Sequence, residues 1–190
     1  MKKSSFGSIQ KGILTTDCDQ IKIHYKSLSR LDIANLRNVL RNTLAMMPSQ
    51  KFEYSSHVND KVRNKEVSLE SEIIQSTLDV FLSNSDGSSN CLIEYNEKSE
   101  NNKIRYRRIL LRSLVTKLVD IKDNGEIKCN YCFVINIDTG RVVTVYWNKA
   151  SDSHDSLDES IYQEPCVAKG LGIKSNIKDV GSMSGSLKTE

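Results

Sequence analysis

The sequence of 190 residues lacks several features that would assign a protein to a class at once. It has no apolar run near the roughly 18 residues that a membrane-spanning helix needs, so we expect no membrane segment. The N-terminus carries Lys2 and Lys3, as a signal peptide would, but no hydrophobic stretch follows them. We therefore expect a cytoplasmic protein, in a single domain that is long enough to bury a core.

Signatures of disulfide frameworks, metal sites and phosphate loops are also missing. The five cysteines are odd in number and irregularly spaced, which indicates reduced thiols. Cys129 and Cys132 form a CxxC pair without a second pair at zinc spacing, and on a strand their thiols would face opposite sides. There is no glycine-rich phosphate loop, HExxH or GxSxG motif, and the carboxylates are scattered. We therefore expect no metal and no cofactor.

The first half of the chain has the pattern of helices. Ile21–Tyr25 alternates and predicts a short edge strand, and Ser29 is a suitable N-cap for a first helix that ends at Pro48. Arg37 is expected on the polar side of that helix, off its apolar stripe. Further helices are predicted over about 56–65 and from Ser68 through Phe81.

From residue 91 onwards the pattern changes to that of strands. A helix remains an alternative for residues 103–113, Asn96–Asn102 is expected to be a turn, and a short helix is expected near 155–162. The predicted strands are 91–95, 103–113, 115–121, 128–137 and 141–148. This order predicts an α+β fold with N-terminal helices packed on a C-terminal antiparallel sheet.

The domain organisation expected from composition has three parts. Residues 1–50 form an N-terminal arm and helix, residues 51–165 form the main domain, and residues 166–190 form a loose tail rich in glycine, serine and lysine. The net charge of +3 permits nucleic acid as a partner without requiring it.

The last predicted strand separates apolar from polar side chains. Val143, Val145 and Trp147 point to one side, because side chains alternate along a strand. The other side carries a polar row of Thr144, Tyr146 and Asn148, which leads towards His154. Such a row is either a solvated outer face or the floor of a site.

Two histidines and an arginine-rich strand have the side chains that RNA cleavage needs. His57, taken alone, fits an exposed helix end, and His154 fits an exposed acidic loop. Together they could supply a general base for the ribose 2′-hydroxyl and a general acid for the leaving 5′-oxygen. If 103–113 is a strand, Tyr106, Arg108 and Arg112 share a face, and guanidinium groups bind phosphate bidentately. The alternative is an edge strand that is kept charged against aggregation.

Short motifs add a family resemblance that covers about residues 51–162. The segment Tyr54–His57, followed by Lys61 and Arg63, resembles the catalytic helix of RelE/RegB-like endoribonucleases in the barnase/EndoU/colicin/RelE superfamily. Leu110–Ser113, Val143–Asn148 and Asp152–Asp158 resemble the later strands and histidine loop of that superfamily. Lys61 stands where the helix of the family has an arginine, so the bidentate fork is lost there.

The hypothesis that joins these observations is a metal-independent endoribonuclease of RelE/RegB-like fold. Its substrate would be RNA in the host cytoplasm, either mRNA or tRNA, free or bound to the ribosome, and an immunity or antitoxin protein is an expected partner. The expected catalytic residues are His57, Arg108, Arg112, Tyr146 and His154. The expected substrate-binding residues are Lys61, Arg63, Thr144 and Asn148.

Two other functions fit the same sequence. One is a catalytically silent protein that binds nucleic acid or a partner through the same basic face. The other is a delivered toxin cargo domain, with the C-terminal tail as its docking segment.

Overall fold

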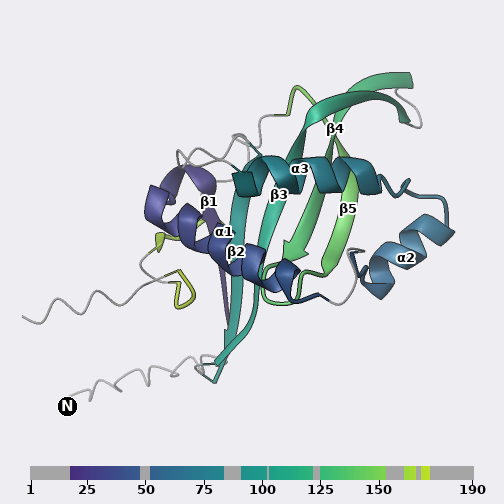
Figure 1. Ribbon diagram of the computed structural model, residues 1–190. Coiled ribbons are helices and arrows are strands. Elements are labelled where there is room, and N and C mark those ends of the chain that lie inside the picture. The colour runs from purple at the N-terminus through teal and green to yellow at the C-terminus, as the bar shows by residue number, and fades with distance from the viewer. Residues whose placement is uncertain are drawn as a thin grey trace, which may run out of the picture.

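A single antiparallel sheet organises the protein (Figure 1). The computed structural model describes residues 18–47, 52–83, 91–101, 103–121, 125–152, 161–165 and 168–171. The five strands lie in chain order across the sheet: β1 (Cys18–His24), β2 (Leu92–Glu100), β3 (Lys103–Ile121), β4 (Gly125–Asn136) and β5 (Val142–Lys149). The predicted antiparallel meander is confirmed, and the predicted edge strand near Ile21 is β1.

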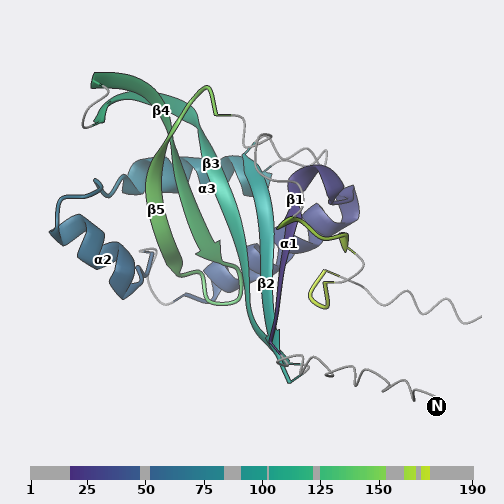
Figure 2. The same cartoon turned by 180° about the vertical axis from the view of Figure 1, so that it is seen from behind.

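Of the three α-helices in the described residues, two cover one face of the sheet. Figures 1 and 2 show α1 (Arg30–Ala45) and α3 (Ser71–Ser83) across that face, while α2 (Ser56–Arg63) lies beside β5. The α+β class is therefore confirmed, but one helix lies at the sheet edge and the N-terminal strand belongs to the sheet. No helix among the described residues is long and apolar enough to span a membrane.

The predicted cap of α1 is present. The Ser29 hydroxyl accepts a hydrogen bond from the Asp32 backbone N–H, and the Asp32 carboxylate accepts one from the Ser29 N–H at 2.9 Å. This capping box satisfies N–H groups that the first helical turn leaves unpaired. The buried stripe of α1 then follows from helical periodicity: Ile33, Leu36 and Leu40.

The prediction that Arg37 lies off this stripe is wrong. Arg37 is buried, and its guanidinium carbon lies 5.2 Å from the centroid of the Phe81 ring on α3. A long arginine stem can be buried among apolar groups while its cation lies over an aromatic face. Sequence periodicity therefore misplaced Arg37, because the contact that holds it comes from another helix.

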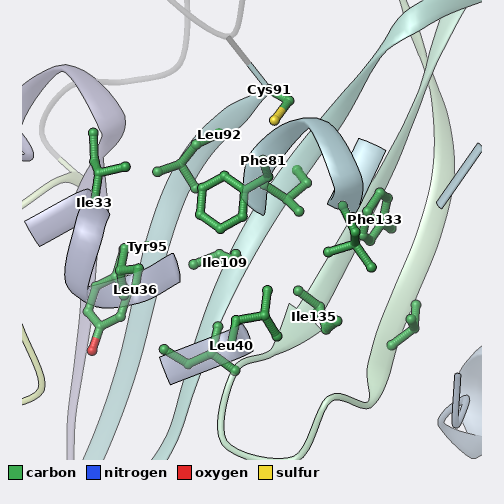
Figure 3. Packing of buried hydrophobic residues seen from close by; sticks show 14 of the residues in the cluster. Ile33, Leu36, Leu40, Phe81, Cys91, Leu92, Tyr95, Ile109, Phe133 and Ile135 are labelled. Atoms are coloured by element: carbon green, nitrogen blue, oxygen red, sulfur yellow. The ribbon is translucent and has the colours of Figure 1, made fainter. Parts of the chain in front are cut away.

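The core lies between these two helices and the sheet (Figure 3). Figure 3 shows Leu36, Leu40 and Phe81 among the side chains that rise from the strands. The fully buried residues of the strands include Tyr95, Ile109, Leu111, Tyr131 and Phe133. Because side chains alternate along each strand, the residues between these positions form the opposite face of the sheet.

The strands β2 and β3 extend well beyond the ranges that the sequence indicated. The segments 103–113 and 115–121 form one strand, β3, whose pairing with β4 is interrupted by a bulge between Arg112 and Thr116. The predicted turn 96–102 is wrong, because β2 continues to Glu100. The chain reverses only around Asn101, whose φ of 49° is in the left-handed region.

A second bulge changes which valine of β5 faces the core. Val142 pairs with Ile135 and Thr144 pairs with Val134, so Val143 is an extra residue without a register partner. Val142 and Val145 are fully buried, whereas Val143 is half-buried. The expectation that Val145 and Trp147 face the same side is confirmed, and that side is the core. Val142 rather than Val143 is the third valine or tryptophan of this strand in the core, because the alternation of side chains breaks at the bulge.

The first described residues of the predicted loose tail pack into the core. Ala168 and Leu171 are buried, and the fully buried carboxylate of Glu97 accepts hydrogen bonds from the backbone N–H groups of Lys169 at 3.0 Å and Gly170 at 2.7 Å. These bonds anchor the segment 168–171. The predicted helix near 155–162 falls largely on residues outside the described part of the chain, as do residues 172–190.

Candidate nucleic-acid interface

The sheet face that is turned away from α1 and α3, called the outer face from here on, carries polar side chains in rows. Strand register places four of them in one row: Lys22, Asn96, Arg108 and Asn136. The adjacent row runs from Glu94 through Leu110 and Val134 to Thr144 on β5. The predicted strand face that carries Arg108 is thus part of a surface to which every strand contributes.

Arg108 lies near the middle of the outer face, and its guanidinium has few interactions with the described residues. Its guanidinium carbon is 3.7 Å from the centroid of the Tyr106 ring. Its Nε is buried and has no hydrogen-bond partner among the described residues, and the same holds for Oδ1 of its neighbour Asn96. A buried polar atom without a partner costs roughly 1–3 kcal/mol, so an adjacent free donor and acceptor point to a place for a ligand.

Arg112 has the opposite environment. Its guanidinium donates to Asn130 Oδ1 from Nε at 3.0 Å and from an Nη at 2.7 Å. It also donates to the backbone carbonyls of Lys149, Ala150 and Asp152. These five bonds connect β3 to the end of β5 and to the turn that follows, so the contacts of Arg112 are those of a structural cross-link.

Tyr146 and Cys132 are direct cross-strand partners in a small apolar cluster on the outer face. Burial raises the pKa of the Tyr146 phenol above its ordinary value and raises the pKa of the Cys132 thiol to about 12. Both groups are therefore protonated at neutral pH. Tyr146, the middle residue of the polar row, is thus half-buried, so this part of the row is not a fully solvated face.

Two hydrogen bonds connect Ser55, the N-cap of α2, to β5 next to Thr144. The Ser55 hydroxyl donates to the Val143 carbonyl at 2.7 Å, and the Ser55 N–H donates to the Val142 carbonyl at 2.9 Å. His57, the second residue of α2, therefore rises at the β5 edge near the level of Thr144, and its side chain is exposed.

Arg108 is not at that edge. Two strand spacings, or about 10 Å, separate its strand from β5. Arg108 and Arg112 are themselves roughly 13 Å apart along β3. The backbone positions of His57, Arg108 and Arg112 are therefore spread over the outer face and its β5 edge.

The remaining predicted residues have varied environments. Arg63 forms an ion pair with Asp60 at 3.4 Å, and both side chains are largely exposed. Lys61 lies one helical turn after His57 on the same helix. Asn148 lies opposite Asn130, at the end of the polar row. His154 falls outside the described residues.

A C-terminal segment borders the outer face at its β1 side. Gln163 exchanges two hydrogen bonds with the backbone of Lys22, one from its own N–H and one through its side-chain oxygen. The Tyr162 hydroxyl donates to Glu94 at 3.1 Å, and its ring lies 5.3 Å from the His24 ring. Among the described residues, this segment forms the border of the outer face at β1.

Sequence reasoning missed Asn96 and left Tyr106 without a role. Asn96 was assigned to a turn, although Glu94, Asn96 and Lys98 alternate with buried residues along β2. That alternation was the available signal, and polar residues at Glu97 and Ser99 on the buried side obscured it. Tyr106 was placed on the correct face, but the contact with Arg108 depends on side-chain conformation.

No protein-family model, curated protein or solved structure matches this chain. Within the described parts of the chain, no three His, Cys, Asp or Glu side chains form a group that could hold a metal ion.

Proposed function

We propose that this protein binds single-stranded RNA across the outer face of its sheet and cleaves it as a metal-independent endoribonuclease of RelE/RegB-like fold. The observation that carries the proposal is Arg108, a half-buried cation that forms no ion pair with any described residue, beside the oxygen of Asn96, which has no hydrogen-bond partner among the described residues. Of the four arginines between 105 and 112, Arg105 pairs with Glu100, Arg107 pairs with Asp138 and Arg112 is bound internally.

The chemistry of this cluster suits a nucleotide. The guanidinium of Arg108 offers N–H donors to phosphate oxygens and a planar face, backed by Tyr106, on which a base can stack. Asn96 can read a base edge through its amide. Single-stranded RNA is favoured, because its splayed bases can lie on a sheet.

The cleavage step uses the edge at β5. His57 would remove the proton of a ribose 2′-hydroxyl, and the 2′-oxygen would attack the adjacent phosphorus. The bond from phosphorus to the 5′-oxygen would break, and His154 would protonate that oxygen. The products would be a 2′,3′-cyclic phosphate and a 5′-hydroxyl, with Thr144 and Tyr146 placing the ribose.

A catalytically silent RNA-binding protein is the second candidate. The observation in its favour is that Arg112, expected at the scissile phosphate, directs its hydrogen bonds to Asn130 and three backbone carbonyls. An active nuclease would instead need Lys61 to stabilise the charge that develops at the β5 edge.

The first experiment measures RNA binding. Arg108→Ala should weaken the affinity for a short single-stranded RNA at least about tenfold and lower the slope of log affinity against log salt by about 0.7. The control is Arg30→Ala, which removes an exposed arginine from α1 on the other side of the sheet. Equal losses in the two variants would refute the proposed binding face.

The second experiment measures cleavage in EDTA. Purified protein should convert RNA to fragments with 2′,3′-cyclic phosphate ends, and His57→Ala and His154→Ala should each slow this by about 100-fold. Binding that depends on Arg108 without any cleavage would favour the silent candidate. Cleavage at unchanged rate in both histidine variants would refute the acid and base assignments.

A further inference from the structure

The β3–β4 arm, made of residues 112–121 and 125–130, projects beyond the rest of the sheet (Figures 1 and 2). Pairing of β2 with β3 ends where Leu92 lies opposite Leu111. Beyond that point, none of the described strands lies on the side of β3 that faces away from β4. Within the described part of the chain, the arm therefore has an open strand edge.

Hydrogen bonds at the base of the arm show which backbone groups lie on the open edge. The Arg112 N–H donates to the Cys91 carbonyl, so it points away from β4, whereas the Tyr131 N–H points towards β3 and donates to the Ser113 hydroxyl. The N–H and C=O groups of successive residues in antiparallel strands point alternately to the two sides. Since those of Tyr131 point towards β3, those of the adjacent Asn130 point away from it, and its partner Thr116 directs its own groups away from β4. The N–H and C=O groups of Thr116, Leu118 and Asp120 therefore line the open edge.

This edge also carries exposed aliphatic side chains. Leu114, Val115 and Leu118 are 56%, 57% and 66% exposed. The bulge that presents Leu114 and Val115 is held by buried groups: the Ser113 hydroxyl donates to the Val115 carbonyl, and Asn130 donates to the carbonyls of Ser113 and Val115. An apolar strand edge on a firmly held arm is typical of a surface for pairing with another strand.

We propose that the strand which covers this edge is the same edge of a second copy of the chain. In an antiparallel pair, the side chains of directly opposed residues point to the same face of the sheet. When both strands are the same segment, related by a two-fold axis perpendicular to the sheet, the two residue numbers in each pair are therefore both even or both odd. With Leu118 on the axis, Leu118 meets Leu118 of the second copy, and Thr116 meets Asp120 of the second copy. All six backbone-bonding residues are then paired.

Neighbouring registers fit less well. A shift of the axis to Lys117 brings two lysines opposite each other, and each of them already pairs with Glu70 of its own copy, so no favourable pair between the copies results. A shift to Val119 puts Leu118 against Asp120 of the second copy. The register centred on Leu118 instead joins an apolar pair with two hydroxyl–carboxylate pairs. This complementarity under two-fold symmetry favours a second copy over an unrelated strand.

The dimer would have a continuous sheet of ten strands with both outer faces on the same side. A two-fold axis perpendicular to the sheet does not exchange its faces. The proposed interface consists of the arm alone, and dimer formation and RNA binding are measured separately.

The experiment is sedimentation equilibrium of the full chain over roughly 1–300 µM, the range expected for so small an interface. The wild-type protein should form a reversible dimer, and Leu118→Lys should raise its dissociation constant at least about tenfold. The matched control is Leu31→Lys, at a 60%-exposed leucine on α1, which should leave the constant unchanged. Circular dichroism checks that both variants are folded.

Hydrogen exchange supplies an independent readout of the pairing. The amides of Thr116, Leu118 and Asp120 should exchange more slowly at dimer-forming concentrations than in dilute solution, while the exposed helix α2 shows no such change. A monomer across the whole range would overturn the proposal. A dimer that Leu118→Lys leaves intact, or that Leu31→Lys weakens equally, would also overturn it.

Discussion

Arg108 and Arg112 allow a direct test of how the outer face is built, because the same residue type occurs at two positions on one strand face. Arg112 makes five hydrogen bonds to the protein, whereas Arg108 stacks on Tyr106 and has no hydrogen bond among the described residues. We predict that Arg112→Ala destabilises the fold strongly and that Arg108→Ala does so weakly.

The magnitude follows from the partners of Arg112. A hydrogen bond to a charged group is worth roughly 1.5–3 kcal/mol, but bonds that share one side chain are not additive. Arg112 is half-buried, so the carbonyls of Lys149 and Ala150 can regain water when it is removed. Asn130 Oδ1 has less access to water, because Asn130 is buried. The expected loss for Arg112→Ala is therefore about 3 kcal/mol, and about 2 kcal/mol for Arg112→Lys.

Arg108→Ala should cost less than about 1 kcal/mol, since it loses one stacking contact and removes a buried donor that has no partner. Urea unfolding followed by far-ultraviolet circular dichroism and by fluorescence of the single tryptophan, Trp147, gives both values. RNA binding at low temperature should fall in Arg108→Ala and stay within about threefold of wild type in Arg112→Ala. Wild-type stability of Arg112→Ala together with lost RNA binding would refute the structural role of Arg112.

Two further predictions concern the core. Gly170→Ala should destabilise the protein by roughly 1–3 kcal/mol in the same urea assay. The reason is that a Cβ at this position would lie 2.7 Å from both the Tyr95 hydroxyl and a Glu97 carboxylate oxygen. The control is Lys169→Ala, which keeps the backbone N–H that Glu97 accepts and should have a smaller effect. Stability should also fall as pH rises above 9, because burial raises the thiol pKa from 9.0 to about 11 for Cys91 and about 12 for Cys132, so the unfolded state ionises first. Each of these thiols contributes a loss of up to about 1.4 kcal/mol per pH unit within its window, and a urea midpoint that is constant from pH 8 to 10.5 would contradict this.

Local patterns in the sequence predicted the elements whose causes are local. Ser29 caps α1 through Asp32, three residues away, and the buried stripe of that helix follows its period. Val145 and Trp147 face the core as strand alternation requires. In each case the residues that determine the outcome are within about one turn or one strand of each other.

The misplaced elements depend on distant parts of the chain. Residues 168–171 looked loose because of their composition, yet the buried Glu97 carboxylate, more than 70 positions earlier, binds their N–H groups. Val142 replaced Val143 in the core because the segment that leads into α2 adds beside β5 at the bulge, through Ser55 and Glu53. A residue-by-residue pattern contains no information about such partners.

The same limit applies to the candidate site. Alternation along β3 correctly placed Tyr106, Arg108 and Arg112 on one face, but the face of a residue does not determine what that residue binds. Arg112 lies where β3 extends past β2, near the carbonyls that end β5, and those carbonyls take its donors. Arg108 lies between β2 and β4, where its cross-strand neighbours are amides and its Nε has no hydrogen-bond partner among the described residues. Two identical side chains four residues apart thus differ because carbonyl groups at the end of β5 accept the hydrogen bonds of Arg112, whereas no described residue supplies an acceptor to Arg108 Nε in the middle of the sheet.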